Sequence, residues 1–133
     1  MTLIDPAVRT SLAARAAGPD PHDAGPGFVA VCPVERLVAD RGVAALVDGV
    51  AVALFRLADG TVHALENIDP FSGASVLSRG LVGDVDGEPT VAAPHYKQRF
   101  ALRDGRCLDA PGVGVRVHEA RVLHGQLAVR LVR

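Results

Sequence analysis

Aromatic residues, cysteines and long apolar runs are all scarce in this chain of 133 residues. Aromatic residues make up 4% of it and tryptophan is absent, which leaves too few rings for a surface that stacks nucleic-acid bases. The formal net charge is -1, so no basic excess attracts nucleic acid or an anionic membrane. Because no run of about 18 apolar residues occurs, the sequence excludes a transmembrane helix. We therefore expect neither nucleic acid nor a membrane among its partners.

Cysteine usage and the first residues indicate the compartment. Cys32 and Cys107 lie far apart in the chain. In a cytoplasmic protein such a pair is interpreted as two separate reduced thiols, with a disulfide as the less favoured alternative. Residues 1–17 lack the order of a secretory signal, because Asp5 and Pro6 fall where an apolar core should be. The expected localisation is cytoplasmic.

The composition changes near residue 27. Nearly every residue from Gly18 to Gly27 is a turn former, and a segment so rich in glycine and proline is costly to order. We interpret residues 1–26 as a flexible N-terminal tail and residues 27–133 as one folded domain. The chain is 49% apolar, which is enough to build a core for a domain of this size.

From Phe28 onward, short apolar segments alternate with turn signals. Asp48-Gly49 supplies the positive-φ pair of a tight type I′ hairpin, and Asp86-Gly87 separates two further segments. The last segment alternates apolar with polar or small residues, as a half-buried edge strand does. Roughly eight to ten strands at a spacing of about ten residues favour an all-β sandwich or barrel over βαβ units. The segments predicted as strands are 28–32, 43–47, 50–55, 61–65, 81–85, 89–93, 115–118, 121–123 and 126–132.

Two segments, 66–80 and 93–100, interrupt the strand pattern. They read Glu-Asn-Ile-Asp-Pro-Phe-Ser-Gly-Ala-Ser-Val-Leu-Ser-Arg-Gly and Ala-Pro-His-Tyr-Lys-Gln-Arg-Phe. Together they resemble the two cluster-binding loops of Rieske domains, a Cys-Pro-His loop near a glycine and a Cys-Pro-x-His-Gly loop that ends in phenylalanine. In both cases a Leu-x-x-Gly-x-Cys/Ala-Leu hairpin follows, here over 102–108. The resemblance implies a Rieske-like (ISP-type) β-sandwich or barrel with a small two-loop subdomain.

The four positions that ligate iron in Rieske domains hold other residues here. Asp69 stands for the first cysteine, Phe71 for the first histidine, Ala93 for the second cysteine and Tyr96 for the second histidine, while Lys97 replaces the glycine. Alanine and phenylalanine cannot ligate iron, and carboxylate or phenol oxygens suit a sulfide-bridged cluster poorly. The pattern residues that are kept are Pro70, Gly73, Pro94 and Phe100. We therefore expect no [2Fe–2S] cluster, no other cofactor and no metal on this chain.

The segments Asp-Pro-Phe-Ser-Gly and Ser-Arg-Gly make the resemblance more specific. Over residues 28–133 the chain is similar to the small subunit of assimilatory NAD(P)H-dependent nitrite reductase. That family implies a cytoplasmic oxidoreductase that reduces nitrite to ammonium in nitrate assimilation, with siroheme, a [4Fe–4S] cluster and FAD on the large subunit. For this chain it implies a non-catalytic subunit that docks on the large subunit and supports it.

A Rieske scaffold without ligands has to act through its surface. Loops on a rigid scaffold commonly carry function, so the former cluster loops, 67–80 and 93–99, are the expected docking face. The candidate docking residues are Asn67, Asp69, Phe71, Arg79, Tyr96 and Lys97. The alternatives are a free-standing ligand- or protein-binding module on the same scaffold and, less favoured, a Rieske-type electron carrier.

Each candidate also has a plain structural interpretation. For Asp69, turn formation by the side chain is favoured over a catalytic acid. Phe71 either anchors a partner or fills the space of the missing cluster, and the Tyr96 hydroxyl could bond back to the first loop. Arg79 and Lys97 could contact acidic groups on a large subunit or a cofactor phosphate, but for either residue alone ordinary surface charge is the favoured interpretation. No catalytic residue stands out, and neither the histidines nor the cysteines have the spacing of a zinc site.

Overall fold

The computed structural model describes residues 27–132. The flexible tail predicted for residues 1–26 therefore lies outside the described residues. Within the described range the fold is all-β, as predicted, with nine strands and two short 3-10 helices. The elements are β1 (Val29–Pro33), η2 (Val34–Arg36), β2 (Arg41–Val47), β3 (Val50–Arg56), β4 (Val62–Glu66), η3 (Leu77–Arg79), β5 (Leu81–Val85), β6 (Glu88–Ala92), β7 (Arg99–Ala101), β8 (Val117–Leu123) and β9 (Gln126–Arg130).

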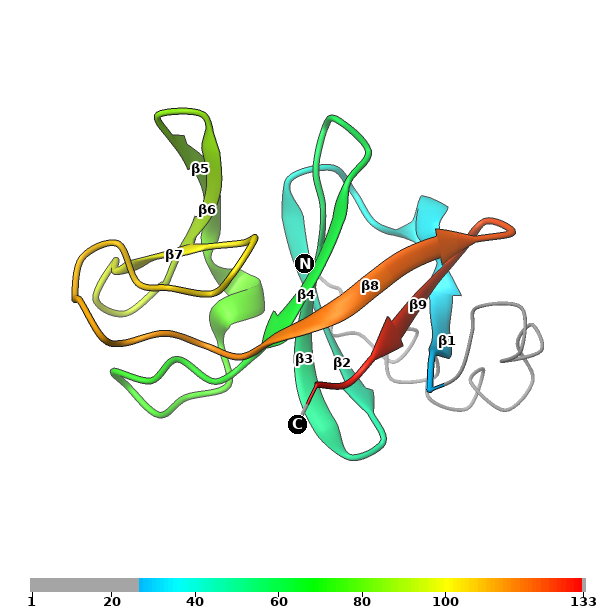
Figure 1. Cartoon of the computed structure of the whole chain (residues 1–133), viewed down its shortest axis with the longest axis horizontal. Helices are drawn as coiled ribbons and strands as arrows, with labels where there is room; N and C mark the ends of the chain where they lie inside the picture. The colour runs from blue at the N-terminus through cyan, green and yellow to red at the C-terminus, as the bar shows by residue number, and fades with distance from the viewer. Residues whose placement is uncertain (1–26, 133) are drawn as a thin grey trace.

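Six strands form one antiparallel sheet in the order β1-β9-β8-β4-β3-β2, and β5, β6 and β7 form a second, three-stranded sheet. The end strands β1 and β2 also contact each other, so the larger sheet curls into a near-barrel. The smaller sheet projects on the left of Figure 1, while β1 lies on the right. This is the predicted arrangement of a barrel-like body and a small subdomain.

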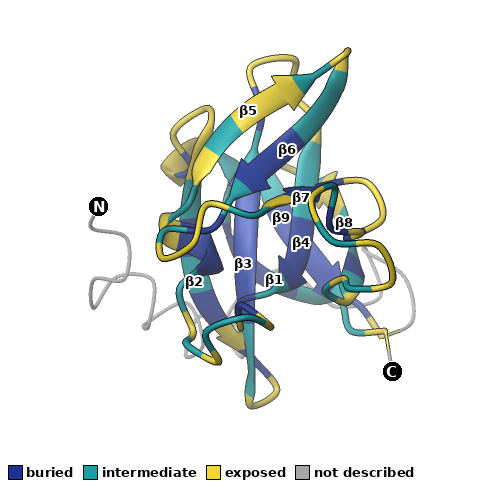
Figure 2. Cartoon of the chain, turned by 90° about the vertical axis from the view of Figure 1, so that its left-hand side faces the viewer, coloured by how far each residue is buried: buried dark blue, intermediate teal, exposed yellow. Residues whose placement is uncertain are grey.

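Strand β3 separates two apolar cores. Successive side chains of a strand point to opposite faces, and here both faces are covered. Val52 and Leu54 face the core inside the near-barrel, whereas Ala53 and Phe55 face the core shared with the small subdomain. Figure 2 shows β3 buried over most of its length and β5 largely exposed. The two-sided burial explains why 50–55 is a nearly continuous apolar run rather than an alternating one.

Tight hairpins connect three pairs of strands. Asp48 and Gly49 have φ values of +47° and +83°, and Asp86 and Gly87 have +52° and +88°. Both φ values are positive, as the type I′ turn predicted for Asp48-Gly49 requires. The turn 124–125 between β8 and β9 has the same signs. These short sequence signals therefore gave the hairpins correctly.

Two predictions about the end of the chain were wrong. The segments predicted at 115–118 and 121–123 merge into the single strand β8, which begins at Val117, because pairing with β9 continues through Glu119 and Ala120. The last strand is not an edge, since β9 pairs with β1 on one side and β8 on the other. Its small residue, Ala128, is buried against Phe28, so the alternation does not mark a solvent-facing side.

The two cysteines are free thiols, as expected, and they lie in different cores. Cys32 belongs to the core inside the near-barrel and Cys107 to the core beneath the small subdomain. Burial raises the pKa of the Cys32 thiol to about 11. Both behave as small apolar residues rather than nucleophiles. In the described part of the chain no helix has the length and apolar character needed to span a bilayer.

Candidate functional site

The two loops singled out in the sequence lie together on the small subdomain. The first loop, 67–80, joins β4 to β5, and the second loop, 93–99, joins β6 to β7. Leu77 and Ala93, one from each loop, belong to the same apolar core. In Figure 1 this part of the molecule lies on the left, away from β1 and the β8–β9 turn. The fold thus brings the predicted segments together on one side of the near-barrel.

Asn67 fixes the start of the first loop from below the surface. Its side chain is 2% exposed, accepts a hydrogen bond from the Ser78 backbone N–H (2.7 Å) and donates one to the Ser75 hydroxyl (3.0 Å). Its backbone donates to the Ala51 carbonyl (3.1 Å) and accepts from the Leu77 N–H (2.9 Å). Asn67 therefore ties β3 to η3, and its side chain positions the loop instead of facing solvent.

Asp69 organises the tip of the first loop. Its carboxylate accepts hydrogen bonds from the Phe71 N–H (2.8 Å) and the Ser72 hydroxyl (3.0 Å), and the residue is 0% exposed. Its backbone accepts from the Gly73 N–H (2.7 Å) and donates to the Ala74 carbonyl (2.9 Å). The bond to the residue two positions on is an Asx turn, so the structural interpretation of Asp69 is confirmed.

Phe71 packs inward, where it contacts the core that both loops share. The ring is half-buried, and its centroid lies 6.2 Å from that of Phe100 at a tilt of 47°. Edge-tilted pairs at this spacing are favourable. Of the two interpretations offered above, the structure supports the one in which Phe71 fills space beside the second loop.

The second loop turns the side chains of its central residues outward. His95, Tyr96 and Lys97 are all exposed, and Tyr96 is 61% exposed with the His95 ring as its aromatic neighbour at 6.1 Å. A tight turn forms beneath them, because the Ala93 carbonyl accepts a bond from the Lys97 N–H (3.0 Å). The prediction that the Tyr96 hydroxyl bonds back to the first loop was wrong. No hydrogen bond to that hydroxyl exists within residues 27–132, since the turn directs the ring away.

The residues at the four ligand positions do not fit a [2Fe–2S] cluster. Both carboxylate oxygens of Asp69 are already hydrogen-bonded, and Phe71 packs on an aromatic ring. Ala93 is buried and has no donor atom, and Tyr96 points outward. Within the described range no group of three or more histidine, cysteine, aspartate or glutamate side chains could hold a metal ion.

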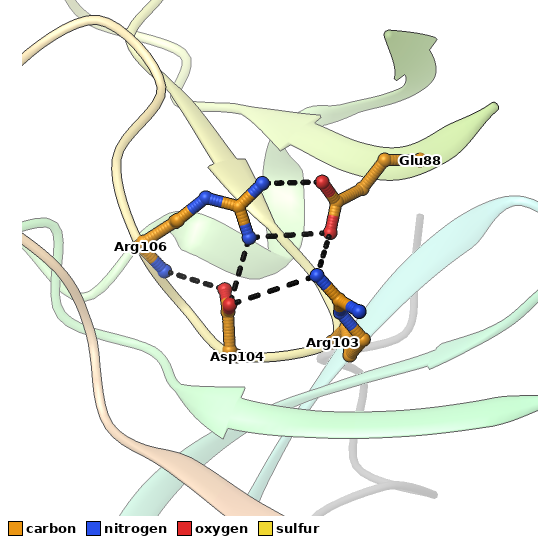
Figure 3. A network of polar contacts seen from close by, with 4 residues as sticks. All are labelled: Glu88, Arg103, Asp104 and Arg106. Carbon is orange, nitrogen blue, oxygen red and sulfur yellow. Dashed lines mark hydrogen bonds and ion pairs between the residues drawn. The ribbon is translucent and has the colours of Figure 1, made fainter. Parts of the chain in front are cut away.

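Ion pairs hold the base of the second loop. Arg99 donates to both carboxylate oxygens of Asp109 (2.7 and 3.1 Å), which lowers the pKa of Asp109 to about 2. Figure 3 shows a second network, in which Arg103 and Arg106 bond to Glu88 on β6 and to Asp104. Hydrogen bonds from Arg106 hold the pKa of both carboxyl groups below its usual range. All these groups are solvent-accessible, so the ion pairs contribute little to the free energy of unfolding and mainly orient the segment 99–109.

Of the six candidate docking residues, the structure leaves three exposed. Arg79, Tyr96 and Lys97 face solvent, whereas Asn67 and Asp69 are buried and Phe71 is half-buried. Sequence reasoning missed two exposed apolar residues beside them, Ile68 at 49% and Leu81 at 73%. Little in the sequence indicated their exposure, because Ile68 lies in the predicted first loop and Leu81 begins a predicted strand.

Comparisons with known proteins agree with this architecture. Residues 27–130 match the model of the Rieske-like [2Fe-2S] domain family. The nitrite reductase (NADH) small subunit of Salmonella typhimurium is 44% identical over 101 residues, which cover 75% of this chain and 94% of the relative. A crystal structure of a Mycobacterium tuberculosis protein assigned as an NADH-dependent nitrite reductase small subunit has a TM-score of 0.77 and 52% identity, over 80% of this chain and 96% of the other.

A further relative has a different organisation. The nitrite reductase [NAD(P)H] large subunit of Klebsiella oxytoca is 44% identical over 100 residues, which cover 75% of this chain but only 10% of that protein. The same domain therefore also occurs as a small part of a much longer chain.

Proposed function

This chain belongs to the Rieske-like family of NADH-dependent nitrite reductase small subunits, and we propose that within this oxidoreductase it acts as a non-catalytic subunit that docks on a larger partner through its two loops. The name of its relatives implies such a larger subunit. We expect the larger subunit to carry siroheme, a [4Fe–4S] cluster and FAD, and the complex to be cytoplasmic. The chemistry of nitrite reduction then takes place on the partner.

One observation carries the non-catalytic role. At the positions where Rieske domains ligate iron, Asp69 and Phe71 serve the internal structure of the loop, and Ala93 and Tyr96 supply no inward-facing donor. We infer that the chain holds no [2Fe–2S] cluster, so its residues bind and orient rather than transfer electrons. The exposed side chains on the same loops are then free to contact another protein.

The arrangement of the Klebsiella oxytoca relative supports a simple stoichiometry. There a matching domain of about 100 residues forms part of the large-subunit chain, so each such chain contains at least one copy. We propose a one-to-one complex for the separate subunits as well.

The experiment that tests the proposal combines three measurements on the purified chain. Iron analysis should find no stoichiometric iron, and a pull-down should recover the large subunit encoded in the same genome. NADH-dependent nitrite reduction by that large subunit should rise, or last longer, when the chain is added. The variant Arg79→Ala should bind more weakly, with Arg36→Ala on η2, which is exposed and lies against the β8–β9 turn, as the matched control.

Two results would contradict the proposal in different ways. A stoichiometric cluster with a Rieske spectrum would favour an electron carrier. An iron-free chain that neither binds the large subunit nor changes its rate would favour a free-standing binding module.

A further inference from the structure

Lys97 has a backbone conformation that does not suit lysine. Its φ is +64°, in the left-handed region that glycine adopts readily. The other non-glycine residues with positive φ in the described range are three aspartates and a histidine. Aspartate and histidine are enriched at positive φ, whereas lysine has no comparable preference for this conformation. At the same position the Rieske loop pattern has glycine, so the turn is kept while the residue best suited to it is not.

The Lys97 side chain has no compensating polar contact in the described part of the chain. It is exposed, and within residues 27–132 it makes no hydrogen bond or ion pair. In contrast, each of three arginines on the same subdomain forms an ion pair with a carboxylate, namely Arg99, Arg103 and Arg106. Strained residues that lack an internal reason concentrate at functional sites. The reason for a lysine here therefore lies outside the described part of the chain.

The surface around Lys97 is cationic and apolar. Leu81 pairs with Ala92, and Gly80 is so close that a Cβ atom there would lie 2.3 Å from the Ala92 carbonyl oxygen. Arg79 and Leu81 therefore lie beside the start of the second loop, and Arg79 is exposed with no ion pair in the described range. The two loops contain one carboxylate between them, Asp69, which is buried.

From these observations we infer that Lys97 is a recognition residue, which pairs with a carboxylate in an acidic patch of the larger subunit. The inference rests on the proposed function, and it adds the chemistry of the partner's surface. Opposite charges across an interface speed association and select the correct partner. Exposed Ile68, Leu81 and Tyr96 supply apolar contact area beside the charges. Lysine is thus retained for binding, at a position where glycine would make the isolated chain more stable.

The test separates stability from binding. Lys97→Gly relieves the strained backbone and removes the charge, Lys97→Arg keeps the charge, and Lys97→Glu reverses it. Each variant is melted alone and titrated with purified large subunit at low and high salt. Lys97→Gly should melt about 3–5 °C higher than the wild type. It should also bind about fivefold more weakly at low salt, while Lys97→Arg stays within about twofold.

Charge reversal and added salt test whether the binding contribution of Lys97 is electrostatic. Lys97→Glu should bind at least about tenfold more weakly at low salt, and the differences should shrink at about 0.5 M salt, where exposed charges are screened. Two matched controls come from η2 and the β8–β9 turn, which are hydrogen-bonded to each other; the turn lies on the right of Figure 1, away from the two loops. His124→Gly changes another positive-φ residue, and Arg36→Glu reverses another exposed charge. Both should bind like the wild type.

Different results overturn different claims. If the wild type binds and both Lys97→Gly and Lys97→Glu bind equally well, Lys97 has no recognition role. If Lys97→Gly melts lower than the wild type, the lysine is kept for structural reasons and the inference is wrong. If the wild type does not bind the large subunit at all, the proposed function fails and this inference fails with it.

Discussion

The near-barrel and the two-loop subdomain are stabilised in different ways. The near-barrel surrounds apolar side chains such as Val52 and Leu54, and apolar burial is non-directional. The first loop depends on Asn67 and Asp69, whose buried polar atoms require particular partners at particular distances. The near-barrel can therefore accept many apolar sequences, whereas the loop conformation depends on a few specific groups.

The residues at the positions that ligate iron in Rieske domains help to hold the two loops in place here. Two of the four positions have a structural role here. The Asp69 carboxylate closes the tip of the first loop, and the Phe71 ring packs on Phe100 beside the second loop. Local hydrogen bonds and one aromatic contact organise these segments, and on our proposal that no cluster is bound they take the place of the metal–ligand bonds of Rieske domains.

The largest effect is expected in the near-barrel. Leu54→Ala removes a fully buried side chain and leaves a cavity, which should cost about 3 kcal/mol of the free energy of unfolding. Chemical denaturation measures this loss. Leu46→Ala on β2 is the control, because Leu46 is 42% exposed and truncating its side chain should cost less than about 1 kcal/mol. Equal losses for the two variants would contradict the assignment of the core.

A smaller and more local effect is expected in the first loop. Asp69→Ala leaves the Phe71 N–H and the Ser72 hydroxyl without their acceptors, which should cost about 2 kcal/mol. Hydrogen exchange should accelerate more over residues 70–76 than in β3. Asp69→Asn keeps an acceptor for the Phe71 N–H and should lose less. If the β3 amides accelerate by the same factor as the loop amides, the loop and the near-barrel unfold as one unit.

The aromatic residues of the two loops should differ in how much they contribute to stability. Phe71→Ala removes a half-buried ring and should cost about 1 kcal/mol, because the ring loses its contact with Phe100. Tyr96→Ala removes an exposed ring and should change stability by less than about 0.5 kcal/mol. Thermal melting measures both. A larger loss for Tyr96→Ala would mean that its ring packs inside the domain.

The smallest effect concerns the ion pair at the base of the second loop. Arg99 lowers the pKa of Asp109 from 3.8 to about 2, so the folded state favours the charged carboxylate. The stability this gives is fully present above about pH 4 and is lost as the pH falls towards 2. Asp109→Asn should therefore be less stable than the wild type at pH 6 and should approach it near pH 2. Denaturation at the two pH values tests this, and a constant difference would contradict it.

Local signals in the sequence predicted the hairpins and most strands, but they missed β7 (Arg99–Ala101), which the strand pattern left in the second interrupting segment. Asp48-Gly49 fixes its turn through its own backbone preferences, and the apolar run 50–55 shows a strand buried on both faces. The position of the last strand could not be predicted in this way. Whether β9 is an edge depends on β1, which is about a hundred residues earlier in the chain and supplies its second partner.

The candidate site was predicted at the level of segments but not of side chains. The resemblance located both loops, and the Asx turn of Asp69 followed from its own residue type. The burial of Asn67 could not be predicted, because its backbone bonds to Ala51 on a strand distant in sequence. The left-handed conformation of Lys97 was also missed, since lysine gives no local sign of it.

The pairing of β1 with β9 has a practical consequence. Val29 and Val129 are register partners, so the first and last strands of the domain meet, on the side of the near-barrel away from the two loops (Figure 1). Domains whose ends lie together can be joined to other chains, or circularly permuted, with little disturbance. A reporter or carrier protein could therefore be fused beside these strands while both loops remain accessible to a partner.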